Sequence, residues 1–70
     1  MIEVFKTNVG EISQARRIVE VLLEHFPEHK INFDLDDCDR ILRVEGKNFM
    51  PEKIVGLVLE KGFYCNVLED

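Results

Sequence analysis

Hydrophobic and polar residues alternate along the first positions of the chain and then change to a helical spacing. The alternation from Met1 to Thr7 predicts a half-buried strand. From Glu11 to Phe26, apolar residues recur every three or four positions, which predicts an amphipathic helix. Pro27 ends this helix because its ring has no N–H and restricts the residue before it. The apolar positions of the helix are Ile12, Ala15, Ile18, Val19, Leu22, Leu23 and Phe26.

Two further alternating runs follow and predict a pair of strands. The first run, Lys30 to Asp36, places Ile31, Phe33 and Leu35 on its inner side. In the second run, Arg40 to Glu45, Leu42 and Val44 share a phase. The acidic segment from Asp36 to Asp39 predicts a tight turn between them, because Asp side chains form local hydrogen bonds in turns.

The last third of the chain predicts a second helix and a final strand. Pro51 suits the first turn of a helix, and Gly62 suits a left-handed C-terminal cap. Gly56 lies inside this helix, where glycine is costly, so we expect it to allow close approach of the first helix. Phe63 to Leu68 alternates again and predicts the last strand.

The resulting order, β-α-β-β-α-β, predicts one domain over residues 1–70 with an α+β, ferredoxin-like fold. In this two-layer sandwich both helices cover one face of a four-stranded antiparallel sheet. Right-handed crossovers place the third strand between the first two, and the fourth on the free side of the first. The loop after the first strand, the hairpin tip and the Gly62 turn then lie at one end of the molecule.

Composition and charge mainly exclude classes of function. The chain has 70 residues, 46% hydrophobic residues and a formal net charge of -5. Such an acidic balance disfavours nucleic-acid binding, since phosphates attract basic surfaces. The longest apolar runs, such as Val21 to Leu23, are far shorter than the roughly 18 residues that a membrane span requires. The charged start, Met1 to Asn8, lacks the apolar core of a secretory signal, so we expect a cytoplasmic protein.

Several segments together resemble the heavy-metal-associated domain family, the copper-chaperone type of ferredoxin-like module. They are Phe5-Lys6-Thr7-Asn8, Ile31 to Leu35, Leu42 to Gly46, Ile54 to Leu59 and Lys61-Gly62-Phe63. The resemblance covers nearly the whole chain and depends on the joint order and spacing of these segments.

The resemblance implies a metal-binding loop of the pattern Met-x-Cys-x-x-Cys, and this chain departs from it. Lys6 stands at the Met position, and Asn8 and Glu11 stand at the two cysteine positions. Amide and carboxylate oxygens are hard ligands that do not favour Cu(I). We therefore expect a degenerate member without a cofactor that docks onto a protein partner through its loop end. The expected contact residues of this loop are Lys6, Thr7, Asn8, Val9, Gly10 and Glu11.

The open face of the sheet is a second predicted contact surface. Phe5, Ile41, Tyr64 and Leu68 are expected to point away from the helices, on three adjacent strands. An apolar patch of this kind indicates a protein partner or a homodimer. Singly exposed apolar residues are also common on protein surfaces, so a scattered arrangement stays open as the alternative.

The two cysteines and two histidines offer a different chemistry. Cys38 lies in a polar stretch and is expected to be exposed, whereas Cys65 is expected to be a small buried residue. A metal carrier would use Cys38 with Asp36, Asp37 and Asp39, aided by Glu11 from the neighbouring loop. Alternatively, the charged tip is solvated and protects the sheet against misassociation. Pro27 separates His25 from His29, so both are expected at the surface rather than as a ligand pair.

Enzymatic motifs are missing from the sequence. The single serine, Ser13, has no nucleophile-elbow or phosphate-binding glycine pattern around it, so we expect no enzyme. A further class shares the predicted topology. It is the ligand-sensing regulatory domain of the amino-acid-binding type, which works as a dimer with ligands at its interface.

Overall fold

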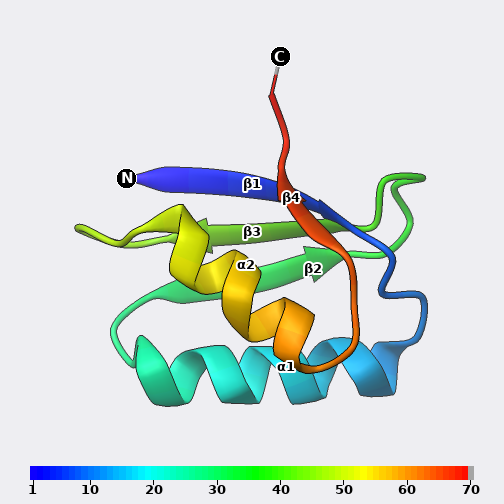
Figure 1. Ribbon diagram of the computed structural model, residues 1–70, viewed down its shortest axis with the longest axis horizontal. Coiled ribbons are helices and arrows are strands. Elements are labelled where there is room, and N and C mark those ends of the chain that lie inside the picture. The colour runs from blue at the N-terminus through cyan, green and yellow to red at the C-terminus, as the bar shows by residue number, and fades with distance from the viewer. Residues whose placement is uncertain (70) are drawn as a thin grey trace.

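The computed structural model describes residues 1–69 and contains the predicted order of elements (Figure 1). The strands and helices are β1 (Ile2–Thr7), α1 (Ile12–His25), β2 (Lys30–Asp34), β3 (Ile41–Glu45), α2 (Pro51–Glu60) and β4 (Cys65–Val67). The four strands form one antiparallel sheet in the order β2-β3-β1-β4. This confirms both the ferredoxin-like α+β fold and the predicted strand order.

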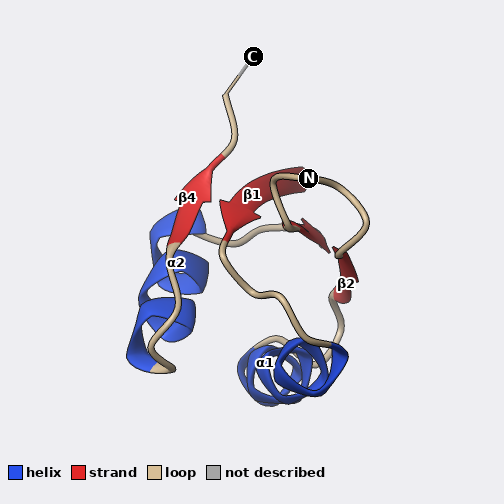
Figure 2. Ribbon diagram, turned by 90° about the vertical axis from the view of Figure 1, so that its right-hand side faces the viewer, coloured by secondary structure: helices blue, strands red, loops and turns tan. Residues whose placement is uncertain are grey.

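Both helices cover the same face of the sheet, and the other face is open (Figure 2). The core forms between these layers and includes residues from every element. Its buried members are Phe5, Val9, Ala15, Ile18, Leu22, Ile31, Leu42, Val44, Ile54, Val58 and Cys65. Neither helix within residues 1–69 is long and apolar enough to cross a membrane.

Local sequence signals account for the helix ends. α1 ends at His25, two residues before Pro27, and Phe26 donates its backbone N–H to the carbonyl of Leu22. Pro51 occupies the first turn of α2, where its missing N–H costs nothing. Gly62 has a φ of 90° just after α2, as the predicted left-handed cap requires.

The connection between β2 and β3 is longer than the predicted tight turn. β2 ends at Asp34 and β3 begins at Ile41, so residues 35–40 form the connection. The Asp34 carboxylate accepts a hydrogen bond from the Asp36 backbone N–H, and the Asp37 carboxylate accepts one from the Asp39 backbone N–H. These local bonds end the ladder earlier than the alternation suggested. Arg40 completes the connection with a φ of 47°.

Two packing predictions for the helices are wrong. A Cβ built on Gly56 would meet no atom within 4 Å, so this glycine does not allow a close helix contact. Ile12, predicted in the buried stripe of α1, is 66% exposed because it lies in the first turn at the edge of the layer. Ala15, Ile18 and Leu22 form the buried side of the helix.

Candidate functional site

The end of β1 and the loop that follows it form hydrogen bonds with two other connections, the one between β2 and β3 and the one between α2 and β4. The Thr7 hydroxyl donates to the Arg40 carbonyl at 2.6 Å and accepts from the Val9 backbone N–H at 3.2 Å. The Thr7 backbone N–H donates to the Asp39 carbonyl at 3.1 Å. Asn8 Oδ1 accepts the Tyr64 backbone N–H at 2.7 Å. These bonds bring the three predicted connections together at one end of the molecule, which we call the loop end.

Only some of the predicted contact residues of this loop are exposed to solvent. Thr7 and Val9 are buried, because Thr7 belongs to β1 and Val9 packs in the core. Both side chains are therefore unavailable to a partner. Lys6, Asn8, Gly10 and Glu11 are exposed. Asn8, at one of the two cysteine positions of the heavy-metal-associated pattern, is used as a hydrogen-bond acceptor within the fold.

The predicted open-face patch requires a correction at Phe5. This side chain is fully buried, since it pairs with Leu42 of β3 and Val67 of β4, both of which pack on the helix side. Ile41 has the predicted open-face phase, opposite to that of Leu42, but is only 7% exposed.

On β1, the apolar residues of the open face have the opposite phase to Phe5. Ile2 is 59% exposed, and Val4, which accepts the Leu68 backbone N–H at 2.8 Å, is half-buried. Tyr64 and Leu68 are exposed, as predicted. We define the open-face patch as Ile2, Val4, Tyr64 and Leu68. Sequence reasoning missed Ile2 and Val4 because both phases of this strand contain apolar residues, and the pairing register decides which phase faces the helices.

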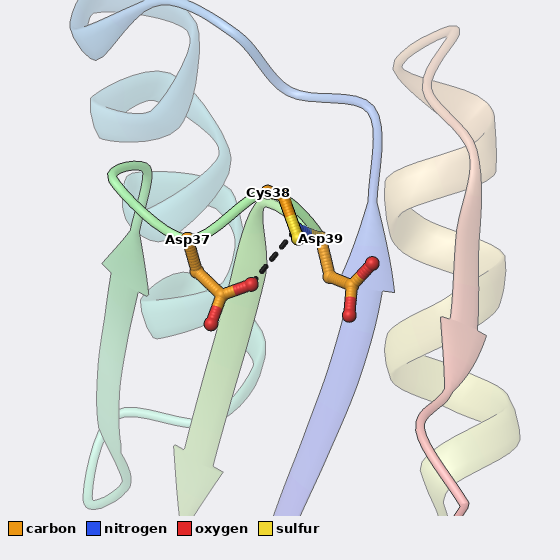
Figure 3. A group of neighbouring side chains, drawn as sticks. All are labelled: Asp37, Cys38 and Asp39. Atoms are coloured by element: carbon orange, nitrogen blue, oxygen red, sulfur yellow. Dashed lines mark hydrogen bonds between the residues drawn. The ribbon is translucent and has the colours of Figure 1, made fainter.

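At the acidic tip, the structure gathers three of the four predicted metal ligands (Figure 3). The ligand atoms of Asp37, Cys38 and Asp39 all lie within 4.8 Å of one another. Asp36 and Glu11 do not belong to this group of the described residues. Two of the three ligands already have partners within the chain: Asp37 Oδ1 accepts the Asp39 N–H at 2.8 Å, and Asp39 Oδ1 lies 3.6 Å from Lys6 Nζ.

The two cysteines occupy opposite environments, as predicted. Cys38 is exposed at the tip, whereas Cys65 is 2% exposed at the start of β4. Burial raises the pKa of the Cys65 thiol from 9.0 to about 12, because the charged thiolate is poorly solvated there. Cys65 therefore acts as a core residue and not as a ligand or nucleophile at neutral pH.

The prediction of two surface histidines is correct for His25 and only partly correct for His29, which is half-buried. His25 is exposed at the end of α1. The His29 ring packs against Phe26 and Phe49, with ring centroids 5.2 Å and 5.3 Å away. Both of its ring nitrogens are buried and form no hydrogen bond within residues 1–69. The Phe26 and Phe49 rings are far apart in sequence, so the spacing around Pro27 gave no signal of this packing.

A mainly apolar groove of about 640 Å³ lies between α1 and β2, and sequence reasoning did not identify it. The exposed Ile12 and the edge position of β2 are the signals that point to it. The lining residues are Ile12, Ala15, Arg16, Val19 and Glu20 of α1, with residues 31–36. No family model, no curated protein and no solved structure matches this chain.

Proposed function

We propose that this protein is a small binding module, related to heavy-metal-associated domains, that has lost the thiol metal site and acts through protein contact. The observation that carries the proposal is the open-face patch, in which Ile2 and Tyr64 are 59% and 46% exposed. Exposed apolar side chains on an uncovered sheet face gain free energy when a partner removes them from water.

The loop end supports the same proposal. Asn8 and Glu11 replace the two soft ligands with hard oxygen donors, and Asn8 holds the Tyr64 backbone in place. Tyr64 belongs to the patch, so this hydrogen bond fixes one of its members relative to β1. In this proposal, the loop that binds metal in heavy-metal-associated domains supports the contact surface in this protein instead.

The test compares wild type with two variants as immobilised bait in a native lysate. We expect a protein that wild type retains to be lost with the double variant Ile2→Asp/Tyr64→Asp, because buried charges oppose apolar contact. Leu59→Asp is the matched control, since Leu59 is 53% exposed but lies on α2 in the other layer. Equal retention by all three baits, each with wild-type circular dichroism, would contradict the proposal.

The acidic tip favours one competing function, a metal carrier. It brings the Cys38 thiol and two carboxylates within 4.8 Å, although Lys6 competes for Asp39. Titration of the reduced protein with Cu(I) and Zn(II) separates the two proposals. A protein-contact module shows no stoichiometric tight binding, whereas a carrier binds tightly and loses that binding in Cys38→Ser. The double variant Asn8→Cys/Glu11→Cys is the positive control, because it restores the thiol pair of the resemblance.

A further inference from the structure

The strand β2 forms one edge of the sheet. Its pairing with β3 shows which of its backbone groups have no partner strand. Met1 and Gly46 exchange hydrogen bonds of 2.8 Å and 2.9 Å, so they are a hydrogen-bonded pair between the β1 and β3 sides of the sheet. Bonding directions alternate along an antiparallel strand. In β3, Leu42 and Val44 therefore bond toward β1, and Arg43 bonds toward Asn32 of β2.

The same alternation applies along β2. Lys30, Asn32 and Asp34 bond inward to β3, which leaves the N–H and C=O groups of Ile31 and Phe33 directed outward at the edge. An edge of this kind is a template for another strand. The opposite edge strand, β4, provides fewer backbone groups for pairing with another strand, because it has only three residues.

The side chains of β2 are self-complementary when the strand meets a second copy of itself in the antiparallel direction. With Asn32 opposite Asn32, the exposed Lys30 of each copy faces the exposed Asp34 of the other. Ile31 of each copy faces Phe33 of the other, a β-branched residue opposite an aromatic one. This register also joins the outward backbone groups of Ile31 and Phe33, and it uses all five residues of the strand.

We propose that two copies of this chain associate through their β2 edges about a twofold axis at Asn32, forming one continuous eight-stranded sheet. The proposal is independent of the open-face patch, which lies on β1 and on the residues that flank β4, and which stays uncovered in such a dimer. Closed twofold symmetry also ends the growth of the sheet at the short β4 edges.

The groove beside β2 gives the association an apolar component. Its walls come from α1 and β2, and Ile31 and Phe33 lie on the helix side of the sheet, where they form part of the lining. A second copy brings its own Ile31 and Phe33 to the same side, because directly opposed residues share a face. The 66% exposed Ile12 stands on the groove wall, beside the incoming strand.

Sedimentation velocity from about 1 µM to about 1 mM protein tests the association and its charge pattern. Wild type is expected to dimerise. Lys30→Asp and Asp34→Lys each create like-charge pairs twice per dimer and should weaken the dimer roughly tenfold. The double variant Lys30→Asp/Asp34→Lys restores opposite charges and should recover wild-type affinity. Lys47→Asp is the control, because it makes the same charge change at an exposed loop position.

A cross-link locates the axis. Residues opposed in a non-hydrogen-bonded pair have Cα atoms about 4.5 Å apart, which permits a disulfide. In a Cys38→Ser background, Asn32→Cys should form a covalent dimer under mild oxidation, whereas Arg43→Cys, one strand inward, should not. A wild type that stays monomeric to about 1 mM overturns the proposal. So does a dimer with wild-type affinity in both single charge variants, or equal cross-linking of the two cysteine variants.

Discussion

The two ends of this sandwich are held together by different forces. At the loop end, Thr7 and Asn8 connect three chain segments through directional hydrogen bonds of 2.6 to 3.2 Å. At the opposite end, His29 packs between Phe26 and Phe49, and its nitrogens form no hydrogen bond within residues 1–69. The loop end depends on side-chain hydrogen bonds, whereas the opposite end combines backbone hydrogen bonds, such as the Met1–Gly46 pair, with the close packing of rings.

The hydrogen bonds at the loop end occupy polar atoms that a ligand would otherwise contact. The polar atoms of Thr7 and of the Asn8 side-chain carbonyl are engaged within the fold, so they hold the loop instead of a ligand. At the opposite end, the fit of the packed rings matters more than the hydrogen bonds of any one side chain. A small change of volume there should cost more than the loss of one hydrogen bond.

The largest expected effect comes from adding one methyl group at the ring-packed end. A Cβ at Gly46 would overlap the His29 ring, and that ring is confined between two aromatic side chains. We expect Gly46→Ala to lower the free energy of unfolding by about 3 kcal/mol, measured by urea denaturation.

The control for Gly46→Ala removes the ring that it meets. In a His29→Ala background, the same substitution should cost less than about 1 kcal/mol, because the two residues are coupled through one contact. An equal cost in both backgrounds would show that the ring packing is not what fixes Gly46.

The next effect concerns Cys65, which pairs with Thr7 at the loop end. Burial raises the pKa of this thiol from 9.0 to about 12, so above pH 9 the unfolded chain loses a proton that the folded chain keeps. The contribution of the Cys65 thiol to the free energy of unfolding is complete below the pKa of the thiol in the unfolded chain, and it falls as the pH rises above that value. Between about pH 8 and about pH 11, we expect a loss of about 2–3 kcal/mol.

Cys65→Ala provides the comparison for the alkaline loss. Other groups titrate equally in both proteins, so the difference between the two pH profiles isolates the thiol. Parallel profiles from urea denaturation would contradict the expected contribution. The exposed Cys38 is present in both proteins and cancels.

The smallest of the three effects comes from the hydroxyl of Thr7. Thr7→Val keeps the shape of the side chain but leaves the Arg40 carbonyl and the Val9 N–H without this partner. We expect a loss of about 2 kcal/mol in urea denaturation. Thr7→Ser retains the hydroxyl and should recover at least half of the loss. If serine and valine are equally destabilising, methyl packing outweighs the hydrogen bonds at this end.

Particular residues show how far the sequence predicts the structure. Alternation, helical spacing and the signals at Pro27, Pro51 and Gly62 predicted the fold and the strand order, because they act on neighbouring residues. The same rules misplaced Phe5 and His29, whose surroundings come from distant segments. Of the predicted metal ligands, the structure gathers Asp37, Cys38 and Asp39 because they are consecutive, and it leaves Asp36 outside.

The sequence by itself determined the element order, the exposure of Cys38 and the burial of Cys65, since local periodicity and polarity specify them. Only the tertiary structure decided which side of β1 faces the helices. Both phases of that strand contain apolar residues, so its register with β3 and β4 decided which phase is buried. The structure also placed β2 at an edge beside the groove. No other strand within residues 1–69 covers this edge, and this is why its Lys-Ile-Asn-Phe-Asp pattern is the proposed pairing surface.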